Sequence, residues 1–274
     1  MRSVRPSVAA PHLLDPFDQE RGEGVGVTLD VESSTVTLAV HGRWGNDLRR
    51  DVHTALRKSL SEHPHHLFID LQDLQDPHAA SVGTWLAARR RCAGLNPGVL
   101  VTLCTAADTA LTARLFRTGA NRFLRIFPDL AQARAAVVDT PLPDRIYLPL
   151  DAVPGSAARA RAAVTDACAS WQLPNLHDRA RLVASELVTN AITHAGTPLA
   201  LVVAHRGDAL QVIVRDGVAV LPRRPELPAT WPGPDLPPRG LGLAAVHAAA
   251  TVWGAMPTLE GKAVWAAIRP EVRR

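Results

Sequence analysis

Three polar residues, Glu186, Asn190 and His194, recur at intervals of four in a segment that is otherwise rich in apolar residues. In a helix this spacing places all three on one side, because residues four apart lie one turn above one another. A carboxylate there can accept a proton from a hydroxyl group or a water molecule, and a carboxamide oxygen is a neutral ligand that suits Mg²⁺. The same pattern is also typical of a solvent-exposed helix face, so the spacing alone leaves both interpretations open.

Two glycine-containing segments follow this helix in the sequence. Asp216-Gly217 comes directly after an apolar run that predicts a strand, although Asp-Gly is also a common turn signal. Arg239-Gly240-Leu241-Gly242 opens a predicted helix, where glycines let phosphate oxygens approach the backbone N–H groups at the positive helix end. Neither segment is specific alone, and the absence of a Walker-type GxxxxGKS/T motif disfavours a P-loop ATPase.

The elements that must position these residues extend from residue 146 to about residue 270. Leu199–His205 and Leu210–Arg215 predict a hairpin of two strands. The other predicted elements are a strand at Ile146–Leu150, helices at Ser156–Trp171, 174–194 and Gly240–Ala250, and a last strand at Ala263–Ile268. A proline-rich stretch, Gly217–Arg239, separates them, and such a long loop is typical of a lid or of a disordered segment.

An earlier part of the chain, about residues 24–139, has its own alternation of strands and helices. Two alternating runs, Val25–Val31 and Thr35–His41, predict a pair of strands joined by a turn. The elements predicted after them are a helix at 48–60, strands at Leu67–Ile69, Val99–Leu103 and Leu124–Phe127, and helices at Ser81–Arg91, Asp108–Arg117 and Asp129–Val138. This order implies an α/β domain with partly parallel pairing. Residues 1–23 are predicted to be a disordered leader, and the proline-containing segment 140–145 a linker.

Composition restricts the class of protein. The chain has 274 residues, which suits two small domains, and 47% of them are hydrophobic, which suffices for normal cores. Its net charge of +4 comes without a cluster of basic and aromatic residues, so no nucleic-acid signature is present. Cys92, Cys104 and Cys168 have neither disulfide nor zinc spacing, and no apolar run is long enough to span a membrane. These features favour a cytoplasmic protein that binds neither nucleic acid nor a membrane.

The order and spacing of the segments after residue 145 resemble the ATP-binding domain shared by gyrase, the heat-shock chaperone, MutL and histidine kinases. Glu186-Leu187-Val188-Thr189-Asn190-Ala191 is similar to the N-box of that superfamily, and Asp216-Gly217, a long loop and Gly240-Leu241-Gly242 follow it. Trp253-Gly254 and Gly261-Lys262-Ala263-Val264-Trp265 resemble the actinobacterial anti-sigma factor serine kinases. The resemblance covers about residues 145–269 and implies a two-layer α/β sandwich, the Bergerat-type ATP-binding fold.

The resemblance also implies a role for each matching residue. Glu186 is expected to be the general base, Asn190 the Mg²⁺ ligand, and Asp216 the acceptor for the adenine amino group. The remaining residues expected to contact the nucleotide are His194, Gly217, Arg239, Gly240, Leu241, Gly242 and Lys262. ATP and Mg²⁺ are therefore the expected ligands.

Three positions depart from that family. Pro238 stands where a glycine is expected, and proline has no N–H for a phosphate oxygen. Val218-Ala219 replaces small polar residues and proline, and Ala263 stands where a threonine that helps to bind adenine is expected. These departures bear on nucleotide affinity and turnover, whereas the Glu and the Asn of the N-box are intact.

Residues 24–139 are similar to the anti-sigma factor antagonist domain called STAS. The matching pieces are Gly42, Phe68-Ile69-Asp70-Leu71 and Trp85-Leu86-Ala87-Ala88-Arg89-Arg90. Active antagonists carry a phosphorylated serine in an Asp-Ser-Ser-Gly segment, and here that segment reads His78-Ala79-Ala80-Ser81, with Ala80 at the phosphoacceptor position. Ser81 is expected to be a helix cap. The domain is therefore expected to dock or regulate, and not to be switched by phosphorylation at this position.

Together the two resemblances predict a regulatory protein of sigma-factor signalling. The first hypothesis is a serine/threonine protein kinase that acts on a STAS-type antagonist partner, whose serine must come from another chain because Ala80 has no hydroxyl group. The second is a non-catalytic switch that sequesters a sigma factor or an antagonist and responds to nucleotide. Relatives of the ATP-binding domain often dimerise, so the resemblance also allows a homodimer.

Overall fold

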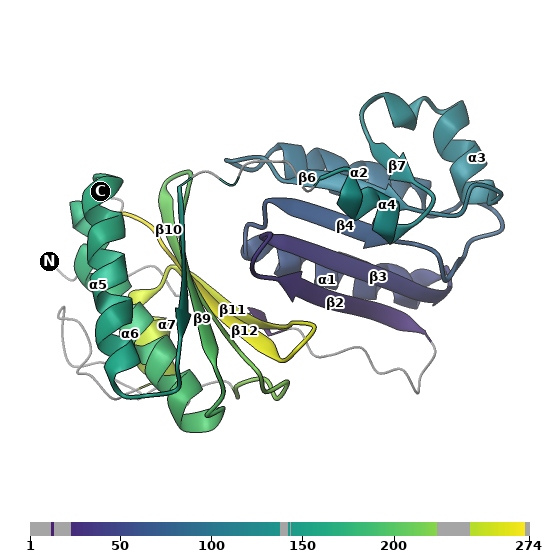
Figure 1. Cartoon of the computed structure of the whole chain (residues 1–274). Coiled ribbons are helices and arrows are strands. Elements are labelled where there is room, and N and C mark those ends of the chain that lie inside the picture. Colours follow the sequence, from purple (N-terminus) through teal and green to yellow (C-terminus); the bar gives the residue numbers. More distant parts are fainter. Residues whose placement is uncertain (1–11, 14–22, 138–141, 143, 224–241, 272–274) are drawn as a thin grey trace, which may run out of the picture. The chain divides into compact units, whose positions relative to one another are not determined.

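The computed structural model describes residues 12–13, 23–137, 142, 144–223 and 242–271. The chain divides into two compact units, each with a sheet of its own (Figure 1). The N-terminal unit is Leu14–Leu142, and the C-terminal unit combines Met1–Leu13 with Pro143–Arg274.

The N-terminal unit is built on a mostly parallel sheet. Its strands lie in the order β2 (Gly24–Asp30), β3 (Thr35–Arg43), β4 (His66–Asp70), β6 (Leu100–Cys104) and β7 (Arg125–Phe127). β2 and β3 form an antiparallel hairpin, and the other neighbours pair in parallel. The short strand β5 (Leu74–Gln75) pairs with the end of β3. Parallel neighbours require crossover connections, which the helices between these strands provide.

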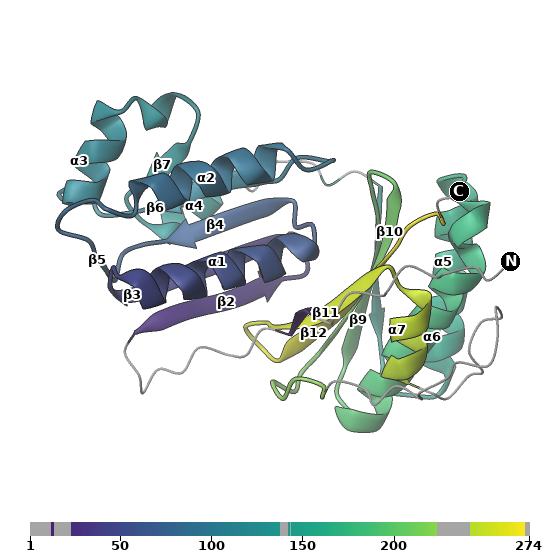
Figure 2. The same ribbon diagram turned by 180° about the vertical axis from the view of Figure 1, so that it is seen from behind.

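These helices cover both faces of the sheet, because Figure 2 shows α1 and α2 in front of it and Figure 1 shows α4 on the opposite side. Their bounds are α1 (Asn46–Ser61), α2 (Val82–Ala93), α3 (Ala110–Arg117) and α4 (Leu130–Ala135). The apolar period that predicts α1 is its buried stripe, Leu48, Val52, Leu56 and Leu60. The predicted order of strands and helices in this unit is confirmed. β5 is an addition, since two residues are too few to carry a periodic signal.

The C-terminal unit is a two-layer sandwich with its helices on one face of the sheet (Figures 1 and 2). The strand order is β1-β11-β12-β10-β9-β8, with β1 parallel to β11 and every other pair antiparallel. The elements are β8 (Arg145–Leu150), α5 (Gly155–Ser170), α6 (His177–His194), β9 (Leu199–Arg206), β10 (Ala209–Asp216), α7 (Leu243–Ala249), β11 (Val252–Pro257) and β12 (Lys262–Ile268). The expected α/β class, with a two-layer second part, is confirmed.

Strand alternation decides which residues of this sheet face the helices. The core shared with α5, α6 and α7 contains Leu210, Val212 and Val214 of β10 and Val264, Ala266 and Ile268 of β12. Side chains of a strand point to opposite faces in turn. Asp216 and Lys262 therefore lie on the helix-covered face, one at the last position of β10 and the other at the first position of β12.

Two elements of the C-terminal unit differ from the sequence prediction. The sequence does not predict β11, because Gly254 and Pro257 weaken its apolar pattern, and its pairing with β12 is a tertiary effect. Helix α7 begins at Leu243, later than predicted. The reason is that Gly242 has a φ of +54°, outside the helical region.

Within the predicted leader, the structure describes His12–Leu13, which form β1 (Figure 1). They pair in parallel with Gly254 and Ala255 of β11. These two residues are therefore part of the C-terminal sheet and not of a disordered leader, because an exposed sheet edge offers their backbone groups hydrogen-bond partners.

The three cysteines are buried and free. Burial raises the pKa of Cys92 to about 11 and that of Cys104 to about 12. Since the thiolate is the reactive form, these thiols are expected to be inert at neutral pH.

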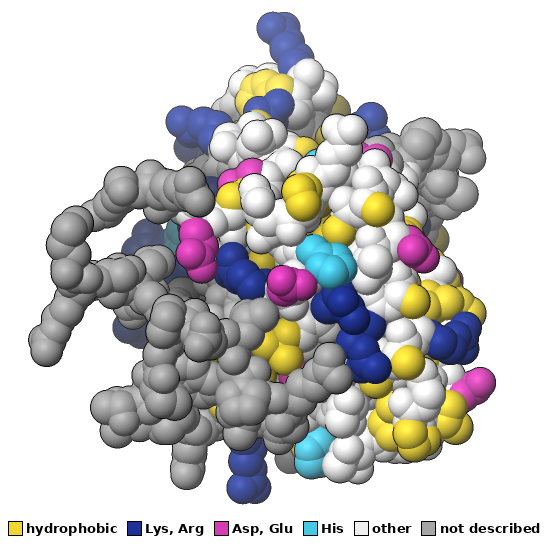
Figure 3. All heavy atoms as spheres, turned by 90° about the vertical axis from the view of Figure 1, so that its left-hand side faces the viewer, with side chains coloured by type: hydrophobic (Ala, Val, Ile, Leu, Met, Phe, Trp, Pro, Cys, Tyr) yellow, Lys and Arg dark blue, Asp and Glu magenta, His cyan; other side chains and the backbone are white. Residues whose placement is uncertain are grey.

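The outer surface over α5 and α6 is chemically mixed. Figure 3 shows cationic, anionic and apolar side chains interspersed on this side of the molecule. In the parts of the chain that the structure describes, no helix has the length and apolar character needed to cross a membrane.

Candidate functional site

Glu186 lies on α6, which packs against α7. Its side chain is 4% exposed, and its Oε2 accepts a hydrogen bond from the backbone N–H of Gly242 at 2.9 Å. Gly242 directly precedes α7. The hydrogen bond therefore joins Glu186, the general base in the resemblance, to the glycine segment that the resemblance assigns to phosphate binding. The alternative interpretation, a solvent-exposed helix face, is wrong for Glu186. A buried carboxylate requires such a donor, because burial without one is costly.

Exposure increases along this side of α6. Asn190, one turn after Glu186, is half-buried, and His194, the last residue of the helix, is exposed. Within the described residues, the Asn190 carboxamide makes no hydrogen bond, so its oxygen can accept a ligand. The described residues contain no group of three His, Cys, Asp or Glu side chains that could hold a metal. Mg²⁺ does not need one, because it binds readily through one or two protein oxygens together with phosphates and water.

Asp216 lies directly opposite Lys262 across β10 and β12. Lys262 Nζ is 2.9 Å from Asp216 Oδ1, and the two side chains are 5% and 1% exposed. Val218 completes the arrangement, because its carbonyl oxygen accepts from Lys262 Nζ and its N–H donates to Asp216 Oδ1. Within the described residues, Oδ2 accepts no hydrogen bond. The carboxylate is therefore fixed through one oxygen, which leaves the other for a further donor.

Two glycines let the backbone segments approach closely at this end of the sheet. A Cβ atom on Gly261 would lie 2.1 Å from the carbonyl oxygen of Asp216, a distance that no side chain tolerates. A Cβ atom on Gly217 would lie 3.2 Å from Oγ1 of Thr197, which accepts the N–H of Gly217 at 2.8 Å. Thr197 is a site residue that sequence reasoning misses, because a single threonine after a helix carries no signal.

The structure does not place Ala263 beside Asp216. Ala263 pairs with Arg215 and Met256, and it lies outside the helix-facing core to which Val264 belongs. By strand alternation its side chain is on the other face of the sheet. The residue opposite the predicted adenine acceptor is Lys262, whereas the side chain at position 263 lies on the other face of the sheet from Asp216.

The predicted phosphate-binding segment is only partly described. Arg239, Gly240 and Leu241 lie outside the described residues, as does Pro238. The elements that carry the other predicted residues pack together, since α6 contacts α7, β10 and β12. Glu186 and Gly242 are therefore joined directly, whereas Asp216 and Lys262 meet at the ends of two strands that α6 covers.

In the N-terminal unit, the loop before α2 places no accessible serine hydroxyl at the phosphoacceptor position. Ala80 is exposed, and Ser81 is fully buried with its Oγ accepting the indole N–H of Trp85 at 2.9 Å. Ser81 occupies the N-cap position, as predicted, but its hydroxyl group does not cap the helix. The carboxylate of Asp76 instead accepts the N–H groups of Ala80 and Ser81, both at 2.8 Å.

One known family matches a segment of the C-terminal unit. Residues 150–266 match the family described as histidine kinase-like ATPase domain. The matched segment contains every site residue named above for the C-terminal unit, from Glu186 to Lys262. No curated protein matches the chain.

Two solved structures are similar to parts of the chain. One is an anti-sigma factor antagonist from Mycobacterium paratuberculosis, at 16% identity and a TM-score of 0.36 over 42% of this chain and 95% of that one. The other contains the RsbU and RsbW domains of a Mycobacterium tuberculosis protein, at 20% identity and a TM-score of 0.34 over 47% of this chain. The present chain covers 32% of the length of that second structure.

Proposed function

We propose, from the match of residues 150–266 to the histidine kinase-like ATPase domain, that this protein binds ATP with Mg²⁺ and phosphorylates a serine of a STAS-type antagonist in sigma-factor regulation. The observation that carries the nucleotide part is the geometry of Asp216. Its Oδ1 is fixed by Lys262 and Val218, and its Oδ2 accepts no hydrogen bond within the described residues. Such a carboxylate oxygen suits the amino group of adenine, which is a donor.

Two glycines set the backbone around Asp216. Gly217 follows Asp216 directly, and Gly261 approaches the Asp216 carbonyl group more closely than any residue with a Cβ atom could. The space beside Gly261 is filled by the backbone of Asp216 and Gly217, and that beside Gly217 by Thr197, so the two glycines allow the tight packing that holds Asp216 at the strand end. Lys262 acts here as a positioning residue, because its ammonium group donates to Oδ1 and holds the carboxylate in its orientation.

Residues of α6 supply the chemistry of the phosphate end. Mg²⁺, when bound with the nucleotide, neutralises charge on the phosphates, and Asn190 would hold it through its carboxamide oxygen. Glu186 would accept the proton of the partner's serine as the serine oxygen bonds to the γ-phosphorus and the bond to ADP breaks. The N–H of Gly242 orients the Glu186 carboxylate for this task. His194 and the segment Arg239–Gly242 would contact the phosphates.

The substrate serine belongs to another protein in this proposal. Ala80 has no hydroxyl group, and the hydroxyl group of Ser81 is buried against Trp85. The protein that is phosphorylated is therefore an antagonist that retains its own serine. A sigma factor is the other partner in this proposal, bound in place of the antagonist or in turn with it. We place the protein in the cytoplasm, where such partners act, and a homodimer is part of the same proposal.

Asp216→Asn is expected to weaken ATP binding by about 10- to 100-fold, because a hydrogen bond to a charged acceptor contributes about 1.5–3 kcal/mol. Calorimetric titration of Mg-ATP measures this. Asp208→Asn is the matched control, since Asp208 is exposed and outside the site. Purine riboside triphosphate, which lacks the amino group, should bind the unsubstituted protein as weakly as ATP binds Asp216→Asn. Absence of ATP binding by the folded protein at millimolar concentration would contradict the proposal.

Asn190→Ala is expected to weaken the binding of Mg-ATP about tenfold and to leave the binding of ATP in EDTA nearly unchanged, since one neutral ligand is lost from the ion. Titration under both conditions separates the effect on Mg²⁺ from an effect on the nucleotide. Thr193→Ala is the control, because Thr193 is exposed on the same helix. Equal weakening with and without Mg²⁺ would assign Asn190 to the nucleotide and not to the metal.

The second candidate function is a nucleotide-responsive switch without catalysis. What favours it is that Glu186 is buried and already accepts the Gly242 N–H, so its carboxylate is engaged within the protein. In that case ATP would bind as above and would only alter the affinity for a sigma factor or an antagonist. Phosphotransfer separates the two functions.

A further inference from the structure

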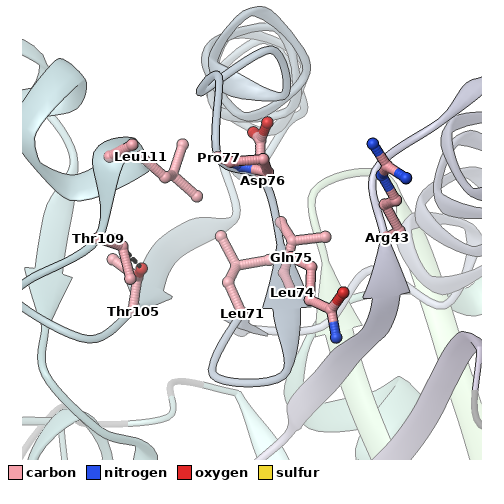
Figure 4. Close-up of a pocket in the computed structure, with 10 residues that line it drawn as sticks. Arg43, Leu71, Leu74, Gln75, Asp76, Pro77, Thr105, Thr109 and Leu111 are labelled. Carbon is pink, nitrogen blue, oxygen red and sulfur yellow. Dashed lines mark hydrogen bonds between the residues drawn. The ribbon is translucent and has the colours of Figure 1, made fainter.

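A cavity of about 520 Å³ opens in the N-terminal unit, at the carboxyl ends of β3, β4 and β6 (Figure 4). This volume lies within the range of about 300–1,000 Å³ that small-molecule sites occupy. Its lining residues all belong to the N-terminal unit, and none is a residue of the proposed nucleotide site. The carboxyl ends of parallel strands are also where α/β folds bind their ligands.

The cavity combines apolar walls with a few polar groups. Leu71, Leu74 and Leu111 supply apolar surface, and Arg43 and Thr109 are among the polar residues that line it. Figure 4 shows Thr109 and Leu111 on one side of the Leu74–Gln75 segment and Arg43 on the other. A ligand that fills the cavity therefore has an apolar body with polar groups toward its ends.

Hydrogen bonds inside the protein fix both walls. On one wall, the two carboxylate oxygens of Asp76 accept the N–H groups of Ala80 and Ser81. On the other, Thr109 Oγ1 accepts the N–H of Thr112, whose own hydroxyl group donates to the carbonyl oxygen of Ala106. The cavity is therefore formed in advance, which lowers the entropy lost on binding.

The charges of the lining favour an anion. Arg43 is the one basic residue among the lining residues, and within the described residues its guanidinium group has no ion pair or hydrogen bond. Asp76 is the one acidic residue, and its charge is already balanced by two N–H donors at the start of α2. An anionic ligand can therefore form an ion pair with the guanidinium group of Arg43. The carboxylate of Asp76 repels it little, because that carboxylate already accepts two hydrogen bonds.

We infer that this cavity binds a small organic anion, a carboxylate or a phosphate ester with an apolar body, with Arg43 as the partner of its charged group. Five lining residues, Leu71 and Leu74–Pro77, lie just before the loop His78–Ser81, in which Ala80 has no hydroxyl group. A reversible ligand here gives the N-terminal unit an input that Ala80, without a hydroxyl group, cannot receive by phosphorylation. This inference does not depend on ATP binding by the other unit.

The test uses methyl NMR of the full chain, with 2-naphthoate and 2-naphthyl phosphate as anionic probes and 2-naphthamide as the neutral match. We expect the methyl signals of Leu71, Leu74 and Leu111 to shift on titration, and the anions to bind about tenfold more tightly than the amide. Arg43→Gln should remove this tenfold preference and leave the binding of the amide unchanged. Arg90→Gln is the control, since Arg90 is an exposed arginine outside the cavity.

A second variant tests the location without disturbing the core. Ala110 is exposed and lines the cavity, so Ala110→Trp should fill it in a folded protein and abolish binding of all three probes. Two results would overturn the inference. One is that no probe shifts the three leucine signals up to its solubility limit. The other is that the anions bind Arg43→Gln as tightly as they bind the unsubstituted protein.

Discussion

Glu186→Gln is expected to lower phosphoryl transfer to the serine of an antagonist partner by about 10²–10⁴-fold, the usual contribution of a general base. Glutamine keeps an oxygen that can accept the N–H of Gly242, so the packing of α6 against α7 is retained while the proton acceptor is lost. The affinity for Mg-ATP should therefore change by less than about fivefold. This pair of effects distinguishes a base from a residue that only holds the structure together.

The measurement is transfer of label from γ-labelled ATP to a candidate antagonist with an intact Asp-Ser-Ser-Gly segment. The same antagonist with alanine at that serine shows the background, and Glu260→Gln, an exposed substitution, is the matched control. If the unsubstituted protein binds ATP yet labels no such antagonist, the non-catalytic switch is the better account. If Glu186→Gln transfers label at the full rate, Glu186 is not the base.

Lys262→Met is expected to lower the free energy of unfolding of the C-terminal unit by about 3–5 kcal/mol, the effect of removing one partner of a buried ion pair. The reason is that the Asp216 side chain is 1% exposed and loses the ammonium group that lies 2.9 Å from it. Urea unfolding followed by tryptophan fluorescence measures this, because Trp253 and Trp265 are fully buried in the C-terminal unit. The transition of the N-terminal unit should not move.

Two controls make this prediction specific to the pair. Lys58→Met replaces a partly exposed lysine of the N-terminal unit and should change stability by less than about 1 kcal/mol. The double variant Asp216→Leu with Lys262→Met removes both charges and should recover much of the loss, since apolar replacements of buried pairs are often tolerated. If Lys262→Met lowers the free energy of unfolding by less than about 1 kcal/mol, the Asp216–Lys262 pair is exposed to water and the prediction is wrong.

Much of the fold follows from local sequence patterns. The period of Leu48, Val52, Leu56 and Leu60 predicts α1, and alternating runs predict both hairpins, because these signals depend only on residues close in the chain. β11 has no comparable signal, since Gly254 and Pro257 interrupt it and its hydrogen bonds come from β12 and β1. Local pattern therefore predicts elements that are amphipathic by themselves and misses those that depend on their neighbours.

The candidate site divides in the same way. The sequence by itself determined that Glu186 and Asn190 share one side of a helix, because helical spacing is fixed. Only the tertiary structure decided that Glu186 is buried against the N–H of Gly242, and that Lys262 and not Ala263 stands beside Asp216. Burial and strand register depend on how distant segments pack and pair. No spacing within the chain encodes them, and this is why Thr197 and the cavity beside Arg43 emerge only from the folded structure.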